Sequence, residues 1–262
     1  MHPALWISKT GLDGQQADLS VISHNLANAS TVGFKKNRAV FEDLLYQNIR
    51  QPGAATTQAT TLPTGLMLGT GVKMVANPKQ FTQGTLQTTD NALDMAIQGR
   101  GFFQVQMPDG TIGYTRAGHF QLNQDGQVVT AGEGYLLEPA ITVPADAQSL
   151  TVGLDGTVSV TLQGQAAPAI IGNITIADFV NHAGLQPSGD NIYLETLASG
   201  APIVGTPGLT GLGLLRGGAL ESSNVNVVEE LVNMIETQRT YEMNAKVIST
   251  VDAMLQYVSQ TL

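Results

Sequence analysis

The sequence predicts an α+β fold in which discontinuous N- and C-terminal coiled-coil helices flank an inserted antiparallel all-β domain, with irregular connecting loops. Two observations predict this order: apolar residues recur every seventh position near both chain ends, and the middle of the chain alternates apolar and polar residues between tight turns. We expect a helical core of residues 1–32 with 223–262, a linker region of 33–95 with 199–222, and a β domain of 96–198.

The first predicted element is a helix over about residues 4–29. Gly11 and Gly14 each cost roughly 1 kcal/mol relative to Ala inside a helix, so this helix is marginal alone and requires a partner. A sustained seven-residue period is typical of a coiled coil. The residues expected to form its stripe are Leu5, Leu12, Leu19, Ile22 and Leu26.

The last 36 residues, 227–262, contain neither Pro nor Gly and predict one helix roughly 54 Å long. A helix of that length does not fit inside a compact domain, so its apolar stripe also requires a partner helix. Ser222, Ser223 and Asn224 precede it and offer helix caps. The residues expected to form its stripe are Val227, Leu231, Met234, Tyr241, Ile248, Leu255, Val258 and Leu262.

Two stretches between the helices and the β domain have no helical or strand period. Residues 47–72 are rich in Thr, Gln, Gly and Pro, and residues 199–218 are rich in Gly. We expect both to be irregular loops. The first contains too many apolar residues for a free linker and should become ordered against a neighbour.

The β domain is predicted from a series of short strands with one buried face. Asp109-Gly110, Asp125-Gly126 and Asp155-Gly156 are strong tight-turn dipeptides that separate several of them. The strands are expected within residues 102–107, 111–116, 119–123, 127–130, 157–162 and 171–179.

Bulk composition argues against several classes of protein. The chain has 12 Lys and Arg against 21 Asp and Glu, a net charge of −9, which disfavours a nucleic-acid partner. It contains no cysteine, which excludes disulfides and thiolate chemistry. The N-terminus lacks the features of a cleaved secretory signal peptide, and no apolar run is long enough to predict membrane insertion.

The sequence contains no motif that predicts catalysis. Phosphate-binding loops, zinc-protease motifs, nucleophile elbows and EF-hand loops do not occur. The histidines at 2, 24, 119 and 182 lack metal-ligand spacing. We therefore expect no catalytic, cofactor-binding or metal-binding residues. A secreted enzyme or carbohydrate-binding β protein with an oligomerisation tail stays an alternative, although it does not explain heptads at both ends.

Residues 23–36, SHNLANASTVGFKK, end the first helix. Gly33 carries no steric penalty in left-handed backbone, and Lys35 would lie near the negative end of the helix dipole. A helix stop followed by a basic turn is the simplest interpretation. The string also resembles the signature shared by the bacterial flagellar rod and hook proteins. Its matching positions are Asn25, Leu26, Ala27, Asn28, Thr31, Gly33, Phe34 and Lys35.

The resemblance extends along the chain. Residues 97–139 are similar to the central domain of the longer family members, and residues 222–256 are similar to the C-terminal signature. Residues 50–72 resemble the segment typical of members that form the distal rod. Proximal rod and hook proteins share most of these motifs and stay as alternatives.

The resemblance implies a structural subunit of the flagellar basal-body distal rod. Such a subunit leaves the cell through the flagellar type III export apparatus without a cleaved signal peptide. It forms a helical homopolymer that transmits motor torque to the hook and is part of the export channel. The implied partners are further copies of itself, the proximal rod protein, the hook protein and the P-ring and L-ring proteins, in the periplasm and through the outer-membrane ring.

Overall fold

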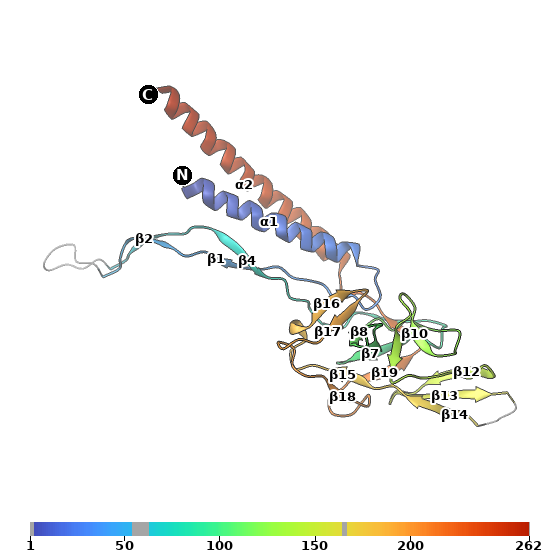
Figure 1. Cartoon of the computed structure of the whole chain (residues 1–262). Coiled ribbons are helices and arrows are strands. Elements are labelled where there is room, and N and C mark those ends of the chain that lie inside the picture. Colours follow the sequence, from blue (N-terminus) through green and yellow to red (C-terminus); the bar gives the residue numbers. More distant parts are fainter. Residues whose placement is uncertain (1–2, 54–62, 164–166, 262) are drawn as a thin grey trace. The chain divides into compact units, whose positions relative to one another are not determined.

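The computed structural model describes residues 3–53, 63–163 and 167–261 (Figure 1). Two helices and a large antiparallel β region confirm the α+β class. The chain divides into two compact units, which are described separately. The first comprises Met1–Ala27, Asn37–Pro78 and Asn226–Leu262, and the second comprises Asn28–Lys36 and Lys79–Val225.

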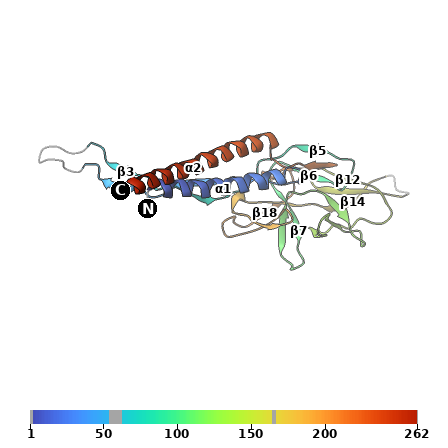
Figure 2. The ribbon, with the colours of Figure 1, turned by 90° about the horizontal axis from the view of Figure 1, so that it is seen from above.

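The first unit contains the helices α1 (Pro3–Ala27) and α2 (Val227–Thr261), which lie side by side and antiparallel (Figures 1 and 2). Both agree with the predicted ranges within two residues, apart from Leu262, which lies outside the described residues. The expected caps Ser222–Asn224 were wrong. The Asn226 side chain instead accepts a hydrogen bond of 3.2 Å from the backbone N–H of Val228, because Asn226 immediately precedes the first helical turn.

An extended ribbon completes the first unit. It is formed by β1 (Val40–Asp43) with β4 (Val72–Ala76) and by β2 (Gln47–Arg50) with β3 (Leu66–Leu68), both antiparallel. The prediction that residues 47–72 are irregular was therefore wrong at these strands. They are short and largely exposed, so no apolar face repeats along them. Residues 54–62 of this segment lie outside the described residues.

The second unit is built on a nine-stranded sheet with β7 at its centre. On β7, the strand β8 pairs along one edge, and β11 and β15 pair along the other. The strands of this sheet are β7 (Phe102–Gln106), β8 (Ile112–Thr115), β9 (Phe120–Leu122), β10 (Val128–Thr130), β11 (Leu136–Glu138), β15 (Ile176–Asp178), β16 (Gln186–Gly189), β17 (Ile192–Leu194) and β18 (Ile203–Gly205).

Smaller sheets complete this unit. The strands β12, β13 and β14 form a three-stranded sheet, β6 pairs with β19, and β5 pairs with β20. A short 3-10 helix, His182–Gly184, precedes β16. The bounds are β5 (Leu86–Thr88), β6 (Met95–Gln98), β12 (Ala147–Val152), β13 (Thr157–Leu162), β14 (Ala169–Asn173), β19 (Leu214–Gly217) and β20 (Ala219–Glu221).

The core of the second unit covers both faces of β7, so the expectation of one buried face was wrong there. Phe103 contributes to an aliphatic cluster with Ile176 and Leu215, whereas its neighbour Phe102 contributes to an aromatic cluster with Tyr193. Successive residues of a strand point to opposite faces, so a central strand packed on both faces loses the alternation that an amphipathic strand shows.

Residues 199–218 were also expected to be irregular, but β18 and β19 both lie within them. β18 pairs with β15 and β19 pairs with β6, far away in sequence. Each strand has only three or four residues, and its backbone partner is supplied by the tertiary fold. A local pattern therefore could not reveal them.

Candidate functional site

The family-motif residues divide between the two units. Asn25, Leu26 and Ala27 form the last turn of α1 in the first unit. In that turn, the Asn25 amide donates to the backbone oxygen of Asn37 at 2.9 Å and accepts from its N–H at 2.8 Å. Asn25 is buried, and these bonds attach the start of the extended ribbon to the end of the helix.

The rest of the motif forms a loop in the second unit. The Thr31 hydroxyl donates to Asn28 Oδ1 at 3.2 Å, closing a turn. Gly33 has a φ of +70°, and a Cβ there would lie 2.6 Å from the carbonyl carbon of Arg116. The Gly33 N–H donates to the backbone oxygen of Glu221 at 2.7 Å. Only glycine fits this conformation and this close approach, as the sequence predicted for the conformation.

Lys35 does not belong to a solvated basic turn. Its ammonium group is fully buried and contacts Glu221 Oε1 at 2.6 Å and the backbone oxygen of Thr82 at 2.8 Å. Arg116 contacts the other carboxylate oxygen, Glu221 Oε2, at 3.2 Å. The exposed fractions are 0% for Lys35, 1% for Glu221 and 4% for Arg116. We call these three residues the buried ion cluster.

The buried ion cluster holds two cations on one carboxylate. Burial lowers the pKa of Lys35, and the charge of Glu221 opposes that shift. The backbone N–H of Gly84 also donates to Glu221 Oε1, at 2.9 Å, and the Arg116 guanidinium donates to the Gly99 oxygen at 2.7 Å. Removing the shared carboxylate would therefore leave two buried cations without their counter-ion.

Asn224 is a second connection inside the same unit. Its Oδ1 accepts from the Lys36 N–H at 2.8 Å, and its Nδ2 donates to the Gln80 oxygen at 2.8 Å. The segment that follows α1 and the segment that precedes α2 are thus both bound within the second unit. Local sequence patterns did not predict the roles of Glu221, Arg116 and Asn224, because the residues they bind are distant along the chain.

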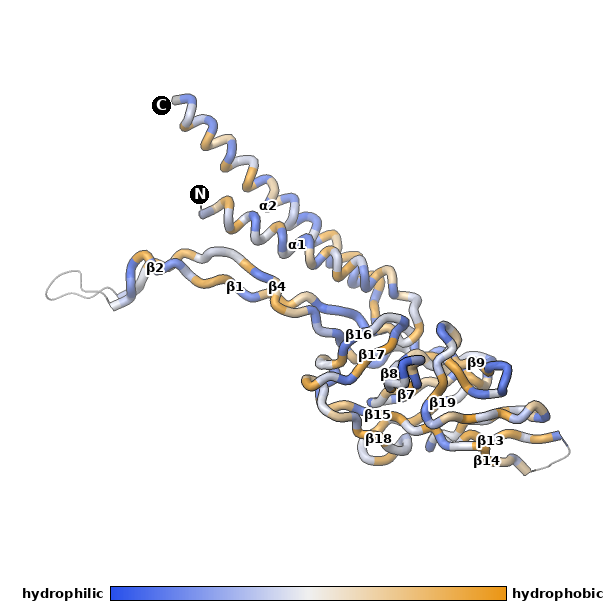
Figure 3. Tube along the Cα trace, viewed as in Figure 1, coloured by the Kyte–Doolittle hydropathy of each residue, from blue (hydrophilic) through white to orange (hydrophobic). Residues whose placement is uncertain are grey.

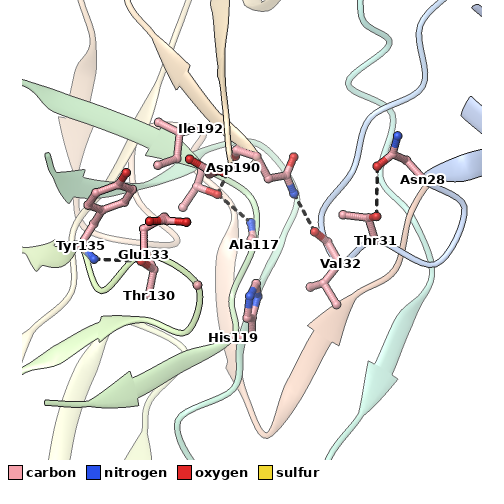
Figure 4. Close-up of a pocket in the computed structure, with 13 residues that line it drawn as sticks. Asn28, Thr31, Val32, Ala117, His119, Thr130, Glu133, Tyr135, Asp190 and Ile192 are labelled. Carbon is pink, nitrogen blue, oxygen red and sulfur yellow. Dashed lines mark hydrogen bonds between the residues drawn. The ribbon is translucent and has the colours of Figure 1, made fainter. Parts of the chain in front are cut away.

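A pocket of about 450 Å³ lies beside the motif loop (Figure 4). Its polar groups are largely used to hold the loop and neighbouring strands together. Asn191 Nδ2 donates to the Val32 oxygen at 2.6 Å, and the Thr115 hydroxyl donates to the Asn191 oxygen at 2.9 Å. Among the lining residues, no nucleophile is paired with a base. These bonds hold the motif loop against the neighbouring strands.

The predicted stripe residues are distributed unevenly over the helix pair. Ile22 is buried, whereas the four leucines of the α1 stripe are half-buried. On α2, Met234 and Ile248 are half-buried. Leu262 lies outside the described residues. The remaining stripe residues on α2 are exposed in the single chain, namely Val227, Leu231, Tyr241, Leu255 and Val258.

Three family models match the chain: "Flagella basal body rod protein" at residues 7–35, "Flagellar hook protein FlgE/F/G D1 domain" at 96–160, and "Flagellar basal body rod FlgEFG protein C-terminal" at 216–261. The flagellar basal-body rod protein FlgG of Buchnera aphidicola from Schizaphis graminum is 58% identical over 99% of this chain and 100% of its own length.

The chain belongs to the flagellar basal-body rod protein family. It is a structural protein of the distal-rod FlgG type and not an enzyme. FlgG of Caulobacter vibrioides is 46% identical over 98% of both chains, whereas FlgF of that bacterium is 34% identical over 95% of this chain and 93% of its own. Of these two proteins from one bacterium, FlgG is therefore more similar to this chain than FlgF is.

Membership implies assembly into the flagellar basal body with other flagellar components. Neither of the two described helices combines the length and the apolar character that a membrane span requires. In the described ranges, His, Asp and Glu side chains form no group of three that could hold a metal ion.

Proposed function

We propose that copies of this chain assemble into the helical tube of the distal rod, with the terminal helices on the inside. The tube transmits motor torque to the hook and forms part of the export channel. Within each copy, α1 and α2 pair as a coiled coil formed from the two chain ends. The similarity to FlgG proteins along the full length supports this proposal.

The partners we propose are further copies of the chain, the proximal rod protein, the hook protein and the P-ring and L-ring proteins. The flagellar type III export apparatus delivers the chain without a cleaved signal peptide. The assembled rod lies in the periplasm and passes through the outer-membrane ring. We assign residues 1–32 with 223–262 to the inner core, 33–95 with 199–222 to a layer between copies, and 96–198 to the outer domain.

The observation that carries the proposal is the apolar surface of α2. Val228 is 70% exposed, and Ile235, Val247 and Met254 are exposed on the same helix. Figure 3 shows hydrophobic positions recurring along its whole length. Covering one such side chain completely stabilises a structure by roughly 1.5–3 kcal/mol. Many of them along one helix strongly favour association with further helices.

Substitution of this surface tests the proposal. Ile235→Asp and Val247→Asp place charges where neighbouring copies would pack, and Gln238→Asp places the same charge at an exposed polar position of α2. In cells that make only the variant, we expect the first two to abolish rods and motility and the third to retain both. Circular dichroism of each purified chain should show an intact β unit.

Normal rods in both apolar-to-Asp variants would contradict the proposal. Electron microscopy of the concentrated wild-type chain separates it from the alternative of a secreted β protein with an oligomerisation tail. Tubes or short rods support the rod assembly, whereas discrete oligomers that hydrolyse a polysaccharide support the alternative.

A further inference from the structure

The seam between α1 and α2 contains polar and small residues that face one another across the two helices. Along each helix these positions are seven residues apart, so they recur once every two turns. We call the set the polar ladder. Its facing pairs are Gly11 with Asn244, Asp18 with Thr237, and Asn25 with Glu230.

Two of these pairs are joined by hydrogen bonds. The Thr237 hydroxyl lies 3.4 Å from Asp18 Oδ2 and also donates to the backbone oxygen of Asn233 at 2.8 Å. Asn25 Nδ2 donates to Glu230 Oε2 at 3.3 Å. Thr237, Asn25 and Glu230 are all buried. A buried polar group that loses its partner is costly, so each pair favours the alignment in which both members meet.

The third pair is a close contact. A Cβ placed on Gly11 would lie only 3.1 Å from Asn244 Nδ2, so the helix backbone comes near that amide. In all three pairs the two residue numbers add to 255. One constant sum over three pairs describes a regular antiparallel alignment along about four turns of α1.

The apolar stripes cannot define this alignment alone. They also repeat every seven residues, so sliding one helix by seven residues along the other again places apolar residues opposite apolar residues. The polar ladder, in contrast, does not pair favourably after a shift of seven residues in either direction. Sliding in one direction places Asp18 opposite Glu230, two carboxylates in a partly buried seam. Sliding in the other direction moves Glu230 beyond the end of α1 at Ala27.

We propose that the polar ladder determines the register of the α1–α2 pair. The leucines and valines contribute attraction, and the polar pairs select one of several alignments that would otherwise be nearly equivalent. Isolated polar residues at coiled-coil core positions are known to specify register at some cost in stability. Here three such pairs act together.

Register also decides how much of α2 extends beyond α1. With a constant sum of 255, Pro3 faces residue 252, so residues 253–261 extend past Pro3, where α1 begins. Met254 and Tyr257 in this overhang are exposed. A slip of seven residues would change the overhang by roughly 10 Å. In the proposed rod, which this last step assumes, copies with different overhangs could not repeat regularly.

Disulfide trapping tests the register directly, because the natural chain has no cysteine. Gln15→Cys with Thr240→Cys reports the native alignment, since their numbers also add to 255. Gln15→Cys with Asn233→Cys, or with Val247→Cys, reports a slip of seven residues in either direction. Oxidation in basal bodies isolated from cells that make only the variant chain should link the first pair on the order of tenfold more than the other two.

The four hydrogen-bonding ladder residues are then replaced together. We expect cross-links in the slipped pairs to rise to a level similar to that of the native pair. This variant combines Asp18→Leu, Asn25→Leu, Thr237→Leu and Glu230→Leu. Ser20→Leu with Gln238→Leu, exposed polar positions on the same helices, is the control and should keep the native pattern. An unchanged native pattern in the four-residue variant would overturn the proposal.

A charge exchange keeps the proposal testable if that variant does not assemble. Thr237→Glu places a carboxylate opposite Asp18 and should reduce the native cross-link and rod formation, and adding Asp18→Lys should restore both. If adding Asp18→Lys fails to restore the native cross-link and rod formation, the proposal is overturned. A failure of the proposed function gives a different result, because the unmodified chain would then be absent from rods.

Discussion

The helix pair and the β unit bury different kinds of surface. The β unit covers apolar side chains on both faces of β7, and Phe102 and Phe103 are fully buried. The helix pair encloses the polar ladder, and much of its apolar surface faces outward, as at Val228 and Ile235. The β unit therefore contains the burial that stabilises it, whereas in the proposed rod the helices depend on burial by neighbouring copies.

Hydrogen exchange should give the largest contrast between the two regions. In the unassembled chain we expect amides of β7 to be protected by several orders of magnitude and those of α2 to exchange rapidly, because its apolar faces lack partners. In assembled rods α2 should become protected. Mass-spectrometric exchange on both forms measures this. Strong protection across residues 227–262 before assembly would contradict the dependence on neighbours.

Core truncation gives the next largest effect. Phe103→Ala should lower the free energy of unfolding of the β unit by about 3–5 kcal/mol, because it leaves a cavity in a fully packed cluster. Leu231→Ala, at an exposed position of α2, should change the unfolding of the isolated chain by less than about 0.5 kcal/mol and yet weaken assembly. Denaturant titration and rod yield test the two parts. Equal losses of unfolding free energy in Phe103→Ala and Leu231→Ala would contradict the contrast between the β unit and the helix pair.

Substitutions in the buried ion cluster should lower the free energy of unfolding by different amounts. Glu221→Gln should destabilise the second unit by about 3–5 kcal/mol, because Lys35 and Arg116 then lack a counter-ion. Lys35→Met should cost less, about 1–3 kcal/mol, because Arg116 still pairs with the carboxylate. Denaturant unfolding of both variants is the measurement, and the reverse order of effects would refute this assignment.

Gly33→Ala tests the motif loop. The left-handed backbone alone should cost about 1–2 kcal/mol, and the contact with the Arg116 backbone adds to it. Gly132→Ala is the control, because no atom lies within 4 Å of a Cβ at that position. Thermal unfolding of both variants should show a lower midpoint only for the first. A shared shift would argue against a special role for Gly33.

The smallest effect concerns the pH dependence of the helix pair. Burial raises the pKa of Asp18 above its ordinary value of 3.8, while the Thr237 hydrogen bond opposes the shift. The folded pair therefore binds a proton more readily than the unfolded chain, and its stability falls as pH rises from below 3.8 through the raised pKa. In assembled rods, helix melting by circular dichroism should lose this component in Asp18→Asn. An identical pH profile in the variant would contradict it.

Local sequence patterns predicted which helices and strands form better than they predicted which elements pack together. The seven-residue period of Leu5 and Leu12 predicted α1, and the Asp-Gly turns bounded several strands. The strands β2 and β3 were missed because they are short and exposed, and β18 and β19 because their partners are distant in sequence. Gly33 could be predicted to adopt left-handed backbone from its residue type. Its contact with Arg116 could not, because 83 positions separate the two residues.

The sequence by itself determined that two long helices end the chain, that a turn-rich β region lies between them, and that one motif resembles the flagellar rod and hook proteins. These features depend on residue type and short-range spacing. Only the tertiary structure decided that Lys35 is buried on Glu221 and that Asp18 faces Thr237 and Asn25 faces Glu230 across the helix seam. Burial and pairing depend on which distant segments pack together, and a seven-residue repeat is compatible with several alignments.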